Sequence, residues 1–190
     1  MRRTLVVMLK EPRPGRVKTR LAREIGAVPA AWWVRHQTAR LLRRLRDPRW
    51  NLELAVAPDR AIASRAWPAG LTRLPQGRGD LGARMGRMLR RPGPVCVIGG
   101  DIPGVTRAHV ARAFTALRNH DAVFGPAEDG GYWLIGIAGR RPRPGFLRGV
   151  RWSSEHALAD SAATLPGWRI AHVDRLRDVD SAADLAACRP

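Results

Sequence analysis

The sequence contains little cysteine and no long apolar run. Two cysteines, Cys96 and Cys188, in 190 residues provide neither a disulfide framework nor a cysteine metal cluster. No apolar run approaches the ~20 residues of a membrane-spanning helix. The first residues lack the apolar core and the small-residue cleavage site of a signal peptide. These absences exclude a disulfide-rich secreted protein and a membrane-spanning protein, and we expect a cytoplasmic protein that contacts no membrane.

Several catalytic motifs are also absent. The sequence has no G-x-S-x-G nucleophile motif, no Walker A loop and no G-x-G-x-x-G dinucleotide-binding loop. Its five histidines show no metal-ligand spacing. A serine hydrolase, a P-loop NTPase and a histidine-ligated zinc enzyme are therefore disfavoured.

Lysine is scarce in a strongly basic chain. The formal net charge is +18 with 34 basic residues, of which only Lys10 and Lys18 are lysine. The basic residues are spread through every segment, so no single tail or helix marks a nucleic-acid interface. A basic surface attracts nucleic acid and phosphorylated small molecules alike, and charge alone does not choose between them.

The order of apolar and polar segments predicts one α/β domain over residues 1–190. Strands and helices alternate, which is typical of a mixed, mainly parallel sheet with helices on both faces. The sequence predicts strands at 4–9, 52–57, 71–74, 95–98, 122–124, 132–137 and 170–173, with that at 132–137 antiparallel. It predicts helices at 21–25, 30–46, 62–67, 107–118, 154–165 and 181–188, and one ending near 90. Ser181 and Asp184 resemble a capping box.

Two aspartates follow predicted strands, beside glycines. Asp101 comes after the apolar run 95–98 and two glycines, and Asp129 follows the strand at 122–124. Ligands of open α/β sheets bind outside the carboxyl ends of the strands. Carboxylates from neighbouring strand ends are suitable Mg²⁺ ligands, so we expect Asp101 and Asp129 to hold a metal. The alternative is that Asp101 caps the helix beginning near residue 106 and that Asp129 is a turn residue.

The loop at residues 10–20 is the first candidate phosphate-binding segment. It is rich in proline, glycine and cations, and both lysines of the chain fall in or beside it. Glycine lets backbone N–H groups approach a phosphate and the cations neutralise it. We expect nucleotide binding here from Lys10, Pro14, Gly15, Lys18 and Arg20, with Lys18, Arg20 and Asp101 as catalytic residues. A solvated basic turn is the alternative.

A second glycine-rich loop, residues 76–85, opens a helix. An amide can contact a base edge, and a helix N-terminus favours an anion. The expected nucleotide-binding residues of this loop are Gln76, Gly79, Gly82 and Arg84. The alternative is a plain helix-capping loop around Asp80.

Four segments, in order, resemble one bacterial family. They are Lys10-x-Pro12-x-Pro14-Gly15-x-Val17-Lys18-Thr19-Arg20-Leu21, Gly79-Asp80-Leu81-Gly82-x-Arg84-Met85, Gly99-x-Asp101-Ile102-Pro103, and Gly125-Pro126-x-x-Asp129-Gly130-Gly131-Tyr132-Trp133-Leu134-Ile135-Gly136. The chain resembles a bacterial family related to nucleotide-diphospho-sugar transferases of the GT-A type. It is distantly similar to phospholactate guanylyltransferase and the molybdenum-cofactor nucleotidyltransferases. The ending Asp178-Val179-Asp180-Ser181-x-x-Asp184-Leu185 is similar to the closing motif of the family.

The resemblance implies a Rossmann-like sheet with nucleotide at the first two loops and Mg²⁺, or Mn²⁺, on Asp101 and Asp129. We expect Gly130, Gly131 and Tyr132 to bind substrate. The sequence departs from the Asp-x-Asp motif of glycosyltransferases, because Gly99 stands where the first acid would be.

The sequence thus favours a metal-dependent transferase acting on a nucleotide and a small-molecule acceptor. Transfer of a nucleotidyl group from an NTP to a phosphorylated metabolite, with release of pyrophosphate, ranks first. Glycosyl transfer from a nucleotide sugar is the alternative. A nucleic-acid-binding domain ranks third: Trp32, Trp33 and Trp50 would be its stacking platform, but two lie in a predicted amphipathic helix and are expected in the core. The sequence leaves open the base, the acceptor and the oligomeric state.

Overall fold

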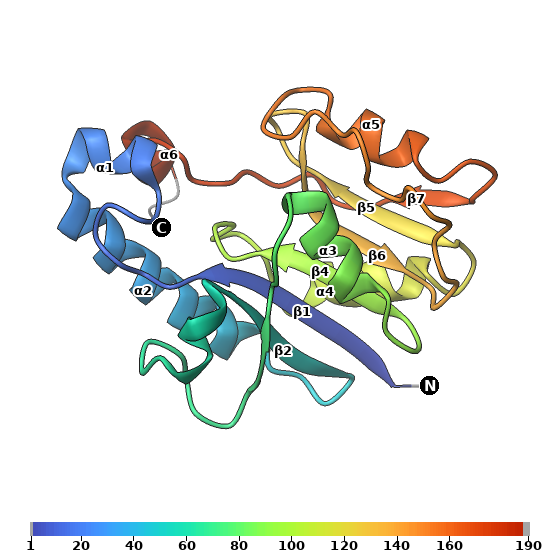
Figure 1. The fold of residues 1–190 in the computed structure, drawn as a ribbon, viewed down its shortest axis with the longest axis horizontal. Coiled ribbons are helices and arrows are strands. Elements are labelled where there is room, and N and C mark those ends of the chain that lie inside the picture. The colour runs from blue at the N-terminus through green and yellow to red at the C-terminus, as the bar shows by residue number, and fades with distance from the viewer. Residues whose placement is uncertain (1, 188–190) are drawn as a thin grey trace.

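The computed structural model describes residues 2–187 and shows one seven-stranded sheet (Figure 1). The strands are β1 (Arg3–Lys10), β2 (Trp50–Ala57), β3 (Thr72–Pro75), β4 (Val95–Gly99), β5 (Ala122–Pro126), β6 (Tyr132–Ile137) and β7 (Ile170–His172). The helices are α1 (Thr19–Ile25), α2 (Ala27–Leu45), α3 (Leu81–Leu89), α4 (Arg107–Ala116), α5 (Ala157–Ala163) and α6 (Ala182–Ala187), with a 3₁₀ helix, η1 (Asp59–Ala63). Cys188, at the end of the last predicted helix, lies outside the described residues.

The sheet is mixed and mainly parallel, as predicted. Its strand order is β3-β2-β1-β4-β6-β5-β7. All neighbouring pairs are parallel except those of β6, which is antiparallel to β4 and β5. The predicted antiparallel strand at 132–137 is therefore confirmed.

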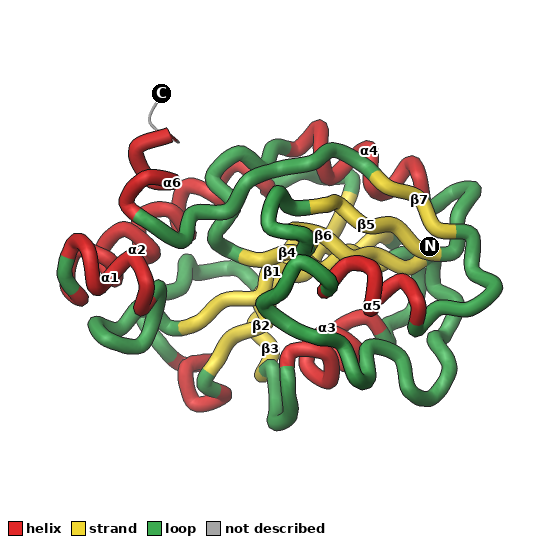
Figure 2. The backbone as a smooth tube through the Cα atoms, turned by 90° about the horizontal axis from the view of Figure 1, so that it is seen from above, coloured by secondary structure: helices red, strands yellow, loops and turns green. Residues whose placement is uncertain are grey.

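Helices cover both faces of the sheet, because side chains alternate along each strand. On β1, Leu5 and Val7 pack in one core with residues of α2 and α4, whereas Val6 packs in the other with residues of α3. Figure 2 shows α4 on one side of the sheet and α3 and α5 on the other. The predicted α/β fold class is confirmed. Among the described residues, no helix is both long and apolar enough to cross a membrane.

The segment after β7 lies along the edge of the sheet at which the parallel strands end. β1, β4 and β5 all end at this edge, and β6 begins there. After β7 the chain runs back along it (Figure 1): the backbone N–H of Leu176 donates to the carbonyl of Pro126 (3.1 Å), and that of Val179 to the carbonyl of Asp101 (3.2 Å). The segment then enters α6, which lies beside α1. Residues 176–181 therefore lie over the ends of β5 and β4.

Two predicted helices differ from the structure. The helix expected at 62–67 is a 3₁₀ helix at Asp59–Ala63 followed by turns, because the buried Trp67 folds back and its indole N–H donates to the carbonyl of Ala61 (2.7 Å). The helix expected at 154–165 begins only at Ala157. The Ser154 hydroxyl donates to the carbonyl of Arg151 (2.7 Å) and accepts from His156 N–H, which forms a turn instead.

The three tryptophans proposed as a stacking platform do not lie on one surface. Trp50, the first residue of β2, is buried in the core, and Trp33 is half-buried. Trp32 is 65% exposed, so its predicted place in the core is wrong. Trp32 directly precedes Trp33 on α2, and adjacent positions of a helix point to different sides.

Candidate active site

A cavity of about 650 Å³ opens at the carboxyl edge of the sheet. Of the predicted site residues, Lys10, Lys18, Arg20, Gln76, Asp101, Asp129, Gly131 and Tyr132 line it. Pro14, Gly15, Gly79, Gly82, Arg84 and Gly130 are not among its lining residues. The first loop, the end of β4 and the start of β6 thus meet at one place, as the parallel topology requires.

Three carboxylates converge in this cavity. Asp101, Asp178 and Asp180 each offer an oxygen atom, and these atoms lie within 4.8 Å of one another. Val179, between the last two, is fully buried, and its N–H is bonded to the carbonyl of Asp101. In an extended segment residues i and i+2 point the same way, so the buried valine directs both aspartates to the cavity.

Asp178 and Asp180 are candidate metal ligands that the sequence analysis does not name as such. Their signal was present as an Asp-x-Asp pair around one apolar residue. This pair follows no predicted central strand, and the resemblance implies Asp129 as the second metal ligand beside Asp101.

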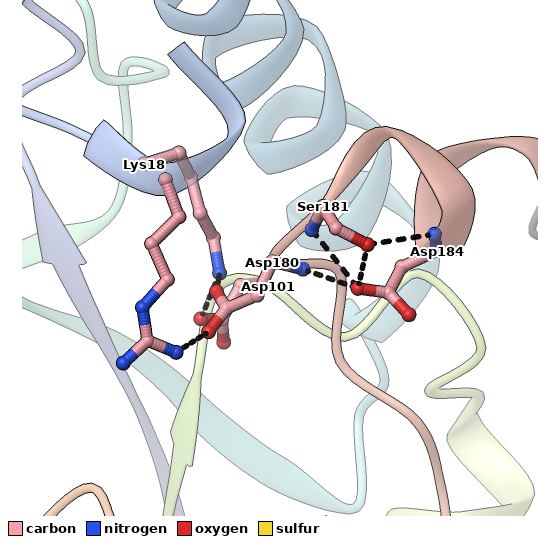
Figure 3. Close-up of polar contacts among 6 residues, drawn as sticks. Lys18, Asp101, Asp180, Ser181 and Asp184 are labelled. Atoms are coloured by element: carbon pink, nitrogen blue, oxygen red, sulfur yellow. Dashed lines mark hydrogen bonds and ion pairs between the residues drawn. The ribbon is translucent and has the colours of Figure 1, made fainter. Parts of the chain in front are cut away.

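The turn after Asp180 is held by a capping box (Figure 3). The Asp184 carboxylate accepts from the N–H groups of Asp180 (3.1 Å) and Ser181 (2.9 Å), and the Ser181 hydroxyl oxygen accepts from the N–H of Asp184 (3.1 Å). The predicted capping box is therefore confirmed, and it fixes the direction of the Asp180 side chain.

Lys18 lies directly on the carboxylates (Figure 3). Its ammonium donates to Asp101 Oδ2 (2.8 Å) and Asp180 Oδ1 (2.5 Å), and its side chain is only 12% exposed. Burial alone would lower the pKa of Lys18, but the charges and hydrogen bonds of Asp101 and Asp180 raise it above its ordinary value. Lys18 thus remains a cation. Arg20 lies at the rim, 71% exposed, with its Nη1 3.4 Å from Asp180 Oδ2.

Asp129 lines the same cavity but does not belong to the group of three. Its Oδ1 accepts from the N–H of Gly131 (2.9 Å), a turn contact. The end of its strand, β5, does not neighbour β4, because β6 lies between them. Two strand spacings separate β4 and β5 by about 9–10 Å. The expectation of neighbouring strand ends is therefore wrong, although the metal role of Asp129 stays a prediction.

The pKa of Asp178 is strongly affected by its surroundings. Burial, together with the negative charges of Asp101, Asp180 and Asp129, raises its pKa to about 6, against the opposing charge of Lys18. A cation bound among these groups would relieve that repulsion.

Polar side chains of the second glycine-rich loop, residues 76–85, form hydrogen bonds within the protein. The buried Gln76 amide donates to the carbonyls of Leu9 (3.1 Å) and Ala55 (2.8 Å), so both its N–H groups hold the ends of β1 and β2 together. The Asp80 carboxylate accepts from Ala83 N–H (2.8 Å), and Arg84 Nε donates to the carbonyl of Gly79. These contacts support the helix-capping alternative, and nucleotide binding by this loop stays a prediction.

Gly82 and Gly130, two of the predicted site residues that do not line the cavity, are packed closely against other backbone segments. A Cβ on Gly82 would lie 2.4 Å from the carbonyl oxygen of Leu147, and one on Gly130 2.4 Å from that of Glu155. Both positions therefore exclude a larger side chain.

Tyr132 lines the cavity, and its hydroxyl contacts a fully buried serine. It lies 3.1 Å from the Ser161 hydroxyl, and burial raises the pKa of Tyr132 far above its usual value. Tyr132 therefore stays protonated near neutral pH and is unsuited to act as a general base.

The donor set fits a hard divalent cation. All three converging groups are carboxylates, the ligand type of Mg²⁺ and Mn²⁺, and each is partly exposed to the cavity. The described residues gather no histidine or cysteine at this point.

Several solved structures, transferases among them, share this fold. A candidate nucleotide-diphospho-sugar transferase from Desulfovibrio desulfuricans G20 is 29% identical, with a TM-score of 0.86 over 97% of this chain and 85% of that one. Rv0371c of Mycobacterium tuberculosis H37Rv, in complex with manganese, is 16% identical, with a TM-score of 0.54 over 98% and 97%. CMP:2-keto-3-deoxy-manno-octonic acid synthetase, complexed with CTP, is 11% identical, with a TM-score of 0.60 over 98% and 96%. A search of curated proteins found no match.

Residues 40–154 match DUF2064, a family described as an uncharacterized protein conserved in bacteria, and the chain belongs to that family. The resemblance seen in the sequence and the prediction of a transferase of this fold are confirmed. Lys18, Asp178 and Asp180 lie outside the matched residues.

Proposed function

We propose that this protein is a divalent-metal-dependent transferase that moves a nucleotidyl group from an NTP to a phosphorylated small metabolite and releases pyrophosphate. The observation that carries the proposal is the meeting of Asp101, Asp178 and Asp180 with a row of cations in one cavity. Carboxylates that hold a metal, next to cations that hold phosphates, are what phosphoryl chemistry requires.

Two sets of cavity residues, the carboxylates and the cations, have different roles in this proposal. Asp101, Asp178 and Asp180 hold Mg²⁺ or Mn²⁺, with Asp129 as a further candidate ligand. When bound, the metal neutralises charge on the phosphate that reacts. Lys18 and Arg20, together with Lys10 and Arg16, which also line the cavity, bind the outer phosphates.

The acceptor would bind on the wall formed by Gly131 and Tyr132. A phosphate acceptor is already ionised at neutral pH and needs no strong base, which agrees with the protonated state of Tyr132. Catalysis would rest on positioning and charge neutralisation. Two low-identity structures of the same fold, one with manganese and one with CTP, are consistent with this division of roles.

Glycosyl transfer from a nucleotide sugar is the second candidate. The observation in its favour is the 29% identity to a protein described as a candidate nucleotide-diphospho-sugar transferase. Against it stands the number of cations on the cavity wall, which exceeds what a diphosphate requires.

The product distinguishes the two candidates. The four NTPs and the common nucleotide sugars are first screened for thermal stabilisation with Mg²⁺, and the best ligand is then incubated with phosphorylated acceptors. Nucleotidyl transfer yields pyrophosphate, whereas glycosyl transfer yields a nucleoside diphosphate. Asp101→Asn is the inactive control. Tighter binding of a nucleotide sugar than of any NTP, with release of nucleoside diphosphate, would establish the second candidate instead.

A further inference from the structure

The Lys18 ammonium lies where a metal bound by the same oxygens would lie. It contacts Asp101 and Asp180 at once, at 2.8 and 2.5 Å, in a nearly buried position. An ammonium bound to one oxygen of each carboxylate fills the space that a cation needs to coordinate the same two atoms. Two of the three candidate ligands are therefore already engaged.

We propose that Lys18 and the divalent cation compete for Asp101 and Asp180, so that metal entry releases the Lys18 side chain to bind the nucleotide phosphates. The inference rests on the metal site of the proposed function. It adds a sequence of events: without metal the lysine closes the site, and with metal it becomes a phosphate ligand.

The charges favour this exchange. One ammonium compensates one of the three negative charges, whereas a divalent cation compensates two. Within residues 2–187 Asp178 makes no salt bridge, and burial and its acidic neighbours disfavour its charged form. Asp178 thus offers an arriving cation an unpaired carboxylate next to the two that Lys18 occupies.

The backbone conformation of Lys18 and its flexible side chain allow the ammonium to contact either the carboxylates or a phosphate. Lys18 has φ 44° and ψ 54°, a left-handed conformation that costs a residue with a Cβ free energy. It sits between the loop 10–17 and α1, and the neighbouring Arg16 and Arg20 line the same cavity. Its flexible four-carbon stem allows the ammonium to leave the carboxylates without movement of the backbone.

The opposite role would be a permanent contact. In that case Lys18 would hold Asp101 and Asp180 in place whether or not metal is bound, and its removal would weaken metal binding. The two roles predict opposite changes in metal affinity when Lys18 is substituted. A measurement of metal binding without nucleotide therefore distinguishes them.

The first experiment measures Mn²⁺ affinity without nucleotide, by calorimetry and by electron paramagnetic resonance of free Mn²⁺. Lys18→Met should bind Mn²⁺ at least about tenfold more tightly than the wild type, if the closed pair is populated to 90% or more. Lys10→Met removes a lysine from the same cavity that makes no ion pair with the three carboxylates, and should change the affinity much less. Circular dichroism and melting temperature confirm that each variant is folded.

The outcomes separate the inference from the proposed function. Equal or weaker Mn²⁺ binding by Lys18→Met overturns the competition but leaves the metal site intact. Absence of Mn²⁺ binding in the wild type and in Lys18→Met overturns both. Asp101→Asn in each background should abolish the binding, which assigns the measured metal to this site.

A second experiment uses the wild type and the scarcity of lysine. Lys10 and Lys18 are the only lysines, so amine acylation followed by peptide mass spectrometry reports on each separately. Saturating Mg²⁺ should increase the labelling rate of Lys18 severalfold and leave that of the exposed Lys10 unchanged. An unchanged Lys18 rate with bound metal would show that the ammonium stays on the carboxylates.

Discussion

Asp101, Asp178 and Asp129 differ in how closely they approach one another, and this difference orders their expected roles. Asp101 and Asp178 belong to the group of oxygens within 4.8 Å, whereas Asp129 is exposed and bonded within its own turn. At the scale of single residues, a ligand is defined by converging oxygen atoms and not by its place after a strand.

Asp101→Asn and Asp178→Asn should each weaken Mg²⁺ or Mn²⁺ binding at least about 100-fold, because each removes a charged ligand from the group. Both carboxylates are partly exposed, so the melting temperature should stay within about 5 °C of the wild type. Asp129→Asn is the matched control and should weaken binding far less. An equal loss in Asp129→Asn would return Asp129 to the ligand set.

Lys18→Ala should weaken NTP binding by about 1.5–3 kcal/mol at saturating Mg²⁺, the range for charge-assisted hydrogen bonds. Arg20→Ala should have a smaller effect, because its side chain is 71% exposed and water competes for the contact. The loss should be larger for a triphosphate than for a monophosphate. Equal losses in titrations of both ligands would show that the loop does not bind the phosphate tail.

At the scale of elements, the strands were predicted better than two of the helices. Runs such as 95–98 are buried on both faces, and their pattern depends on sequence alone. The ends of α5 and η1 were decided by side chains that bond to the backbone, those of Ser154 and Trp67. Such contacts depend on where a side chain finds a carbonyl, which periodicity does not reveal.

α4 begins with a capping box in which histidine replaces the usual acid. The Thr106 hydroxyl oxygen accepts from the His109 N–H (3.4 Å), and His109 Nδ1 accepts from the Thr106 N–H (3.2 Å). Thr106→Ala should therefore destabilise the fold by about 1 kcal/mol in chemical denaturation. Thr115→Ala, on the exposed side of the same helix, is the control and should cost less.

The capping box of Thr106 and His109 should make the stability of the folded protein depend on pH. Burial lowers the pKa of His109 below 6.5, with Arg112 adding to the effect and Asp174 opposing it. The folded state therefore favours the neutral ring, and its stabilisation is complete above pH 6.5 and lost as the pH falls through the lowered pKa. Melting temperatures between pH 7 and 5 should fall less in His109→Gln, whose amide oxygen accepts without titrating. Parallel curves for variant and wild type would contradict this role.

At the scale of the whole molecule, the candidate site depends on residues 176–181, which lie over the ends of β5 and β4. Val179 is fully buried, bonded to the carbonyl of Asp101, and lies between two of the three carboxylates. The position of Asp178 and Asp180 is thus a property of the complete fold.

Val179→Ala should weaken metal binding severalfold while destabilising the fold by about 1–2 kcal/mol, as loss of buried methyl groups does. Val150→Ala removes the same groups from a buried valine in the core that contains Val6, and should leave metal binding unchanged. Calorimetry of Mn²⁺ binding and denaturant titration give both quantities. If the two variants behave alike in metal binding, the returning segment is not held by Val179.

The sequence alone determined the mixed α/β sheet, the antiparallel strand at 132–137, the basic loop with Lys18 and the aspartate after the central strand. These follow from local patterns: apolar runs, glycines and charges at strand ends. Tertiary structure alone decided that β6 separates Asp129 from Asp101 and that the segment after β7 brings in Asp178 and Asp180. It also decided that Lys18 pairs with Asp101 and Asp180. These partners are 83 and 162 residues from Lys18 along the chain. Contacts at such separation are formed by the packing of the sheet and of the returning segment, which no local pattern encodes.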